Sequence, residues 1–103
     1  MSREVLQRLS EPMYYLLLSV IEENHGYAMM QDITMLSKNR VKVGTGTLYA
    51  LISRFEQEGL IVKTREEDRK KYYRITKKGI SFLKEEYQNL KNQLNDGKII
   101  EEL

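Results

Sequence analysis

The side chains in this sequence that can do chemistry are its cations, which are concentrated in one stretch. Eight basic and three acidic residues lie between Lys63 and Lys78, a local charge of +5 in a chain whose total charge is +2. The rest of the chain is therefore net −3. A basic stretch of this kind either neutralises an anionic partner such as phosphate or forms a solvated charged surface, and by itself it favours neither.

The residue types needed for catalysis or metal binding are scarce. His25 is the only histidine and the sequence contains no cysteine, so neither a thiolate metal site nor a nucleophilic triad can be built. The sequence also lacks a Gly-rich phosphate loop, a paired-carboxylate pattern and a metal-ligand spacing. We therefore expect no enzymatic activity, no catalytic residue, no metal and no cofactor, and we assign His25 a structural role at a helix end.

The composition indicates a single ordered domain. A chain of 103 residues with 41% hydrophobic and 31% charged residues suits one folded core. No run of eighteen apolar residues exists, and Met1–Glu11 lacks the apolar segment of a signal peptide. We expect a cytoplasmic protein without membrane contact.

Three helices are predicted before the basic stretch. Apolar residues recur at helical spacing over Pro12–Glu23. A second helix is expected from about Tyr27 to Leu36, and a third from Thr45 or Thr47 to Glu58. Gly59 follows the third helix, where it can take the left-handed conformation that commonly ends a helix. The stretch 40–46 is then the turn between the second and third helices.

The apolar pattern then changes from a period of 3.6 to a period of two. Leu60–Arg65 and Lys70–Ile75 are short β-branched and aromatic runs around a turn over 66–69, which indicates a β-hairpin. Thr76 can cap a last helix, whose apolar residues form a seam at spacings of 3 and 4: Ile80, Leu83, Tyr87, Leu90 and Leu94. Because the seam covers only about two heptads, it predicts packing against another helix and not a free-standing coiled coil.

This order of elements is that of a winged helix-turn-helix. We therefore expect a mainly α fold with a small β-hairpin (α+β) and an added C-terminal dimerisation helix. Within a single domain, 1–103, residues 1–11 would form an N-terminal arm and 12–76 the winged-helix DNA-binding core. Residues 77–95 would form the dimerisation helix and 96–103 a tail.

The candidate DNA contacts follow from this fold, in which the third helix enters the major groove with its N-terminal part towards the bases. Ser53 and Arg54 are the candidates for base discrimination. Near the helix start, the candidates for phosphate contacts are Thr45, Thr47 and Tyr49. The hairpin adds basic candidates, which are Lys63, Arg65, Arg69, Lys70 and Lys71. The acidic run over 66–68 argues mildly against a DNA contact there.

Four motifs stand in order along the chain: His25–Tyr27, Val43–Tyr49, Glu58–Ile61, and Asp68–Thr76 followed by Gly79. Over about residues 10–85 the sequence thereby resembles the PadR family of winged-helix transcriptional regulators, in its small single-domain form. The resemblance implies a homodimeric, mostly repressing DNA-binding protein whose last helix, assisted by the N-terminal helix, forms the dimer interface. It also implies a phosphate contact for Tyr27, for which the alternative is a half-buried side chain that packs between helices. Thr45 stands where the family often has proline, so we expect a slightly different start of the third helix.

The expected function is sequence-specific regulation of transcription by a homodimer on an inverted-repeat operator in double-stranded DNA. The dimer contacts are expected from the N-terminal arm and the seam: Leu6, Leu9, Ile80, Leu83, Tyr87, Leu90 and Leu94. A small-molecule effector is left open. The alternative is a winged-helix module that binds protein and not DNA, with RNA as a third class of partner. An acidic or apolar recognition helix would favour a protein partner, and stacking aromatic residues across a sheet would favour RNA. The sequence shows neither feature.

Overall fold

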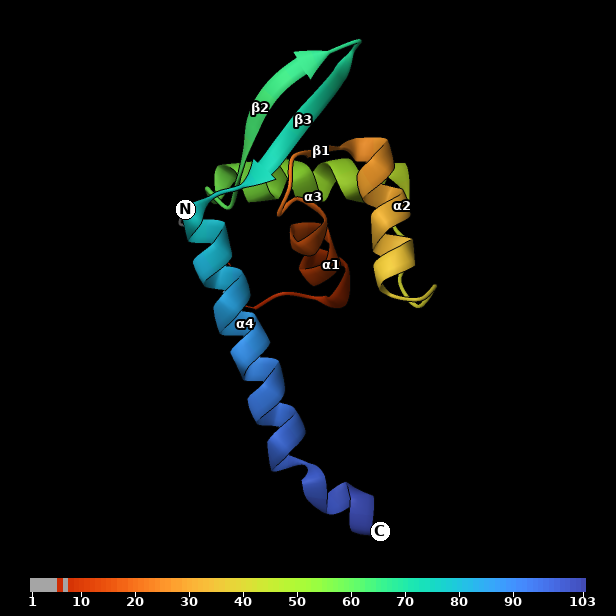
Figure 1. Ribbon diagram of the computed structural model, residues 1–103, viewed down its shortest axis with the longest axis vertical. Coiled ribbons are helices and arrows are strands. Elements are labelled where there is room, and N and C mark those ends of the chain that lie inside the picture. Colours follow the sequence, from red (N-terminus) through yellow and green to blue (C-terminus); the bar gives the residue numbers. More distant parts are fainter. Residues whose placement is uncertain (1–5, 7) are drawn as a thin grey trace, which may run out of the picture.

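A short three-stranded sheet stands on one side of a cluster of helices, and a long helix extends away from the cluster (Figure 1). The computed structural model describes residue 6 and residues 8–103. In these residues the helices are α1 (Glu11–Ser19), α2 (Gly26–Leu36), α3 (Thr45–Gln57) and α4 (Lys77–Asp96), followed by a 3₁₀ helix, η1 (Lys98–Glu102). The strands β1 (Asn24–His25), β2 (Ile61–Glu67) and β3 (Lys70–Ile75) form an antiparallel sheet in the order β1-β3-β2. The predicted α+β winged helix-turn-helix is confirmed.

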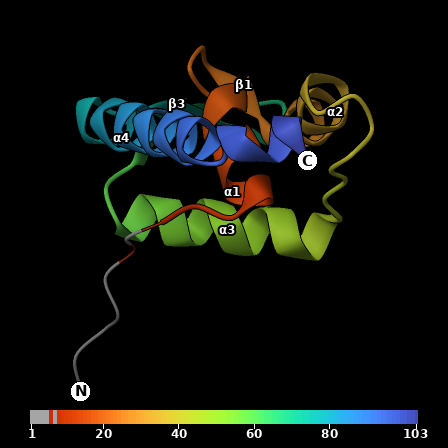
Figure 2. The same ribbon diagram turned by 90° about the horizontal axis from the view of Figure 1, so that it is seen from below.

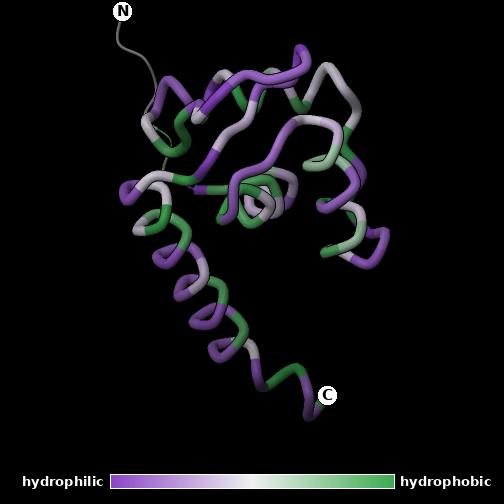
Figure 3. The backbone as a smooth tube through the Cα atoms, turned by 45° about the horizontal axis from the view of Figure 1, so that its top comes forward, coloured by the Kyte–Doolittle hydropathy of each residue, from purple (hydrophilic) through white to green (hydrophobic). Residues whose placement is uncertain are grey.

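The core lies between α1, α2, α3 and the base of the hairpin. The apolar stripes expected on these helices supply most of it: Leu16, Leu17, Val20, Met29, Ile33, Leu48, Ile52 and Phe55 are all buried. Tyr73 and Ile75 of β3 close the core on the side of the sheet. In Figure 3 the hydrophobic residues accordingly gather on the inner side of the helices, and the outer part of the hairpin is hydrophilic. Each large side chain buried here contributes roughly 1.5–3 kcal/mol.

Helix α1 ends at Ser19, earlier than the predicted end at Glu23. The chain turns after Ser19, and the side-chain amide of Asn24 donates a hydrogen bond to the Ser19 carbonyl oxygen at 2.9 Å. Asn24 and His25 then pair with β3 as the short strand β1, which the sequence did not predict. Ile21, expected on the inner face of the helix, is consequently exposed, and so is Leu36 at the end of α2.

Two tight connections fix α3 relative to its neighbours. Before α3, Lys38 and Asn39 both have left-handed backbone conformations, and the buried Ser37 hydroxyl accepts a hydrogen bond from the Val41 amide at 2.9 Å. After α3, Gly59 has the expected left-handed φ of 75°. The Leu60 amide donates to the Phe55 carbonyl at 2.9 Å, which completes a Schellman ending.

The hairpin of β2 and β3, here called the wing (residues 61–75), has a tighter turn than the sequence predicted. Only Asp68 and Arg69 form the turn, and both have positive φ angles, of 52° and 66°. This is the backbone of a type I′ turn, whose twist matches that of the flanking strands. The strands therefore continue to Glu67 and from Lys70, which carries the basic tip of the wing away from the core.

Helix α4 begins at the exit of the wing and runs away from the helix cluster (Figure 1). Its predicted cap is confirmed, because the Thr76 hydroxyl accepts a hydrogen bond from the Gly79 amide at 3.0 Å. Gly79 lies so close to the Leu60 carbonyl oxygen that any side chain at this position would collide with it. No helix in the described residues is long and apolar enough to cross a membrane.

Candidate nucleic-acid interface

The outer face of α3 points away from the rest of the molecule. Seen from below (Figure 2), α3 lies on one side of the protein and α2 and α4 lie on the other, with α1 between them. The four candidates on its outer and lateral surfaces, Thr45, Thr47, Tyr49 and Ser53, are all exposed. Gly44 precedes α3, and no side chain in the described part of the chain caps the helix. The first amide groups of α3 can therefore bind an acceptor from outside.

A hollow of about 290 Å³ lies beside α3, where the start of α2 meets the wing. Its lining residues come from all three elements: His25, Gly26, Tyr27, Tyr49, Arg69, Lys70, Lys71 and Tyr73. Three of these side chains are cations and none is a carboxylate. Because the N-terminal turn of α2 also borders the hollow, its positive helix end adds to the positive potential of the cations. These features suit a phosphate group.

Tyr49 occupies a position in this hollow that requires a glycine opposite. A β-carbon added to Gly26 would lie 2.5 Å from the Tyr49 hydroxyl oxygen, which is too close for a real contact. The phenol of Tyr49 therefore packs against Gly26, the first residue of α2, although Tyr49 is 52% exposed. Tyr27, 64% exposed, borders the same hollow. Both tyrosines are candidates from the sequence alone, whereas Gly26 is not, because its role depends on the close approach of two helices.

The wing presents two different charged faces because of a β-bulge. The register is irregular between Lys63 and Arg65, so that Lys63 pairs with Tyr73 and Arg65 with Tyr72. Directly paired residues share a face of a sheet, and Tyr72 and Tyr73 lie on opposite faces. Lys63 thus lies on the Tyr73 face, where its ammonium pairs with Glu66 at 3.3 Å, and Arg65 lies on the opposite face.

Arg65 is engaged on that far face. Its guanidinium stacks on the Tyr72 ring at 3.8 Å and donates from Nε to Glu23 at 3.0 Å, and a second ion pair joins it to Glu67. Hydrogen bonds from Thr64 and then Arg65 lower the pKa of the Glu23 carboxyl. Arg65 therefore lies apart from the cations that line the hollow, and the proposed phosphate contacts do not include it.

Arg54 also differs in its surroundings from the other residues of α3. Ser53 follows Tyr49 by four residues and shares its flank, whereas Arg54 lies about 140° further round the helix than Tyr49. Its side chain is 38% exposed, and its Nε lies 3.5 Å from a carboxylate oxygen of Glu58. To reach a base, Arg54 would have to leave this pair.

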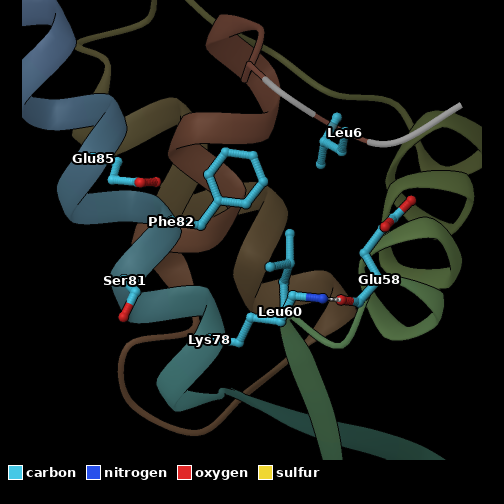
Figure 4. A pocket seen from close by; sticks show the side chains of 7 residues that line it. All are labelled: Leu6, Glu58, Leu60, Lys78, Ser81, Phe82 and Glu85. Atoms are coloured by element: carbon cyan, nitrogen blue, oxygen red, sulfur yellow. Dashed lines mark hydrogen bonds between the residues drawn. The ribbon is translucent and has the colours of Figure 1, made fainter.

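A second hollow, of about 390 Å³, lies at the joint between α3 and α4 (Figure 4). Leu6, Leu60 and Phe82 form its apolar walls, and Lys78 donates a 2.7 Å hydrogen bond to the Glu58 carbonyl oxygen. The end of the candidate recognition helix is thereby tied to the first turn of α4. Nearby, Arg8 binds the buried carboxylate of Glu86 at 2.9 Å, which ties the N-terminal arm to α4.

The predicted dimer residues divide into two groups. Leu83 is buried in the core of its own chain, and Leu6 and Leu9 pack against that core. The other four remain exposed along α4: Ile80, Tyr87, Leu90 and Leu94. Helix α1 packs against α4, and burial, with Tyr87 as a second cause, raises the pKa of Tyr14.

Comparison with known proteins agrees with the fold. The sequence model of the family described as "Transcriptional regulator PadR-like family" matches residues 16–85. An uncharacterized protein X of Lysinibacillus sphaericus is 31% identical over 68 residues; the match covers 62% of this chain and 62% of that protein, less than two thirds of its length. A PadR family transcriptional regulator from Eggerthella lenta is 29% identical with a TM-score of 0.68, over 86% of this chain and 80% of that one. A transcriptional regulator from Clostridium thermocellum is 26% identical with a TM-score of 0.66, over 89% and 90%.

Proposed function

We propose, from the premise that this chain belongs to the transcriptional regulator PadR-like family, that it is a homodimeric repressor which binds an inverted repeat in double-stranded DNA. Family membership makes it a DNA-binding regulator of transcription, and regulators of this family are not enzymes. We propose in addition that the protein represses transcription, that it is a dimer, that its operator is symmetric, and that it makes the DNA contacts given in this subsection. In a bacterial cell such a regulator would act in the cytoplasm, where the chromosome lies.

The hollow bordered by α2, α3 and the wing is the observation that carries the proposed DNA contact. With α3 in the major groove, a backbone phosphate beside the groove would enter this hollow. Tyr27 and Tyr49 would donate hydroxyl hydrogen bonds to it, while Lys70 and Lys71 would neutralise its charge. Thr45 and Thr47 in the first turn of α3 would bind a second phosphate. Ser53 would face the base edges, and Arg54 would join it after leaving its pair with Glu58.

The exposed seam of α4 supports the dimer. Four apolar side chains along one helix remain uncovered in the single chain, and pairing with a second copy would bury them. A two-fold dimer presents two identical recognition helices to one side of the duplex. The operator should therefore be an inverted repeat with half-site centres about one helical turn, roughly 34 Å, or a multiple of it apart.

The salt dependence of DNA binding tests the phosphate site. Duplexes selected from a random library would be titrated by fluorescence anisotropy at several salt concentrations with Lys71→Ala, Lys70→Ala and the control Lys84→Ala, which changes an exposed lysine of α4. Because the dimer carries each substitution twice, each wing variant should reduce the steepness of the log–log slope by about 1.8, and the control should not change it. If both wing variants kept the full slope and affinity, the wing would not contact DNA and a protein-binding module would be favoured. A selection without dyad symmetry would contradict the two-fold arrangement.

A further inference from the structure

We propose that η1 of one protomer docks into a methionine-lined hollow beside α2 of its partner. This contact of Lys98–Glu102, made once at each end of the dimer, is here called the hook. This inference rests on the homodimer proposed above and adds to it a second contact, separate from the α4 seam. The occupant of the hollow is thus a second copy of this chain.

The first observation is that η1 is folded but not covered. The chain bends at Gly97, and η1 follows the end of α4 beyond this bend (Figure 1). The two isoleucines of η1, Ile99 and Ile100, are 62% and 67% exposed, and Leu103 directly after η1 is 97% exposed. A group of large apolar side chains at the tip of an extended helix is the kind of exposed patch that marks a protein contact.

The second observation is an apolar hollow of about 480 Å³ on the outer side of α2. Met30, Met35 and Val43 form its apolar surface, and Met35 is 73% exposed. Methionine side chains are flexible and adapt to the shape of an incoming aliphatic group. The rim is held in place by the turn around the buried Ser37, so the hollow does not depend on a loosely placed loop.

The charges of the two surfaces are complementary. Lys42 lines the hollow, and the turn before it carries Lys38 and Arg40, of which Arg40 is paired with Glu11 at 3.1 Å. Residues 37–43 contain no acidic residue. The segment η1 carries Glu101 and Glu102 directly after its two isoleucines. Aliphatic groups entering the hollow would therefore bring two carboxylates to a basic rim, an arrangement that selects this segment over a basic one.

The arrangement of the chain requires that this contact forms between two copies. Figure 1 shows η1 at the lower end of the molecule and α2 in its upper half, because α4 carries η1 away from the helix cluster. A dimer built on the α4 seam brings the end of one α4 towards the core of the partner. Two-fold symmetry then makes the same contact twice.

Disulfide trapping with single-cysteine proteins tests the proposal, because the sequence contains no cysteine of its own. Met35→Cys and Ile100→Cys would be made in separate proteins, one with a size tag, and mixed before mild oxidation. The mixed pair should form a covalent heterodimer, since a bridge needs α-carbons within about 7 Å. The matched control is Ser53→Cys mixed with Ile100→Cys, which should form none, because Ser53 lies on the outer face of α3.

Sedimentation of the same mixtures separates the two proposals. A non-covalent dimer with no more cross-linking from Met35→Cys than from Ser53→Cys would overturn the hook and leave the dimer intact. A monomer in solution would overturn both.

The contribution of the hook to affinity gives an independent measurement. Ile99→Asp combined with Ile100→Asp should raise the dimer dissociation constant at least about a hundredfold, since each of the two buried isoleucines contributes about tenfold or more. Lys98→Ala, on the same segment, should change it by no more than about twofold. An unchanged dissociation constant for the double aspartate variant would contradict the docking.

Discussion

Replacing Gly26 by alanine should weaken DNA binding without weakening the fold. A β-carbon at this position would meet the Tyr49 hydroxyl at 2.5 Å and the adjacent ring carbon at 3.0 Å, so the phenol must move. It is half exposed and can move outward at little cost. Gly26 is the first residue of α2 and has no positive φ, and alanine is favoured over glycine in helices by up to about 1 kcal/mol. Calorimetry should therefore show an unchanged or slightly raised Tm.

DNA binding should fall because the displaced Tyr49 hydroxyl leaves the phosphate hollow. A hydrogen bond to a charged group contributes about 1.5–3 kcal/mol, which corresponds to roughly a ten- to hundredfold loss of affinity. Because phosphate is common to all sequences, specific and non-specific duplexes should lose similar factors. Fluorescence anisotropy with both kinds of duplex measures this directly.

A double-mutant cycle shows whether Tyr49 carries the effect. Tyr49→Phe alone should also weaken both duplexes, and in the Gly26→Ala background it should add little, since the hydroxyl is already displaced. Wild-type affinity in Gly26→Ala, or losses that simply add in the double variant, would refute the assignment of Tyr49 to the phosphate.

Leu90→Asp should give a monomer by sedimentation with its fold retained, whereas Leu83→Ala should destabilise the single chain by about 2–5 kcal/mol in chemical denaturation, because Leu83 is buried in its own core. Arg54→Ala should cost about 1–3 kcal/mol on the selected operator and relax its sequence preference; unchanged preference would mean that Arg54 stays with Glu58. The pKa of the Glu23 carboxyl, measured by NMR titration, should lie below its ordinary value of 4.5. Its pair with Arg65 should therefore be intact above pH 4.5 and be lost as the pH falls through the lowered pKa. Thr64→Ala should raise this pKa, because it removes the hydrogen bond that lowers it most.

Local signals in the sequence were sufficient for most of the architecture. The stripes of three helices, the glycine ending of α3 and the Thr76 cap of α4 depend on residues within one or two turns of each other. The structure confirms them except at the ends of two stripes, where Ile21 and Leu36 are exposed. The candidate residues on the outer face of α3 follow from the same periodicity, because the residues opposite a buried stripe are exposed.

The placement of the wing cations required more than local pattern. Alternation along β2 would put Lys63 and Arg65 on the same face, and the bulge between them separates the two. Thr64 and Arg65 bind Glu23, which lies far away in the sequence, so no window of neighbouring residues contains this information.

By itself, the sequence determined the helices, the hairpin and the family, because helical stripes, turn residues and short motifs are local properties of the chain. Only the tertiary structure decided that residues 24–25 form a strand, that Leu83 belongs to the core and that the Tyr49 phenol packs against Gly26. Each of these depends on a partner that the fold brings from a distant part of the chain: β3 for Asn24 and His25, the helix cluster for Leu83, and α3 for Gly26. Their roles are set by packing and pairing energies that exist only once the segments meet.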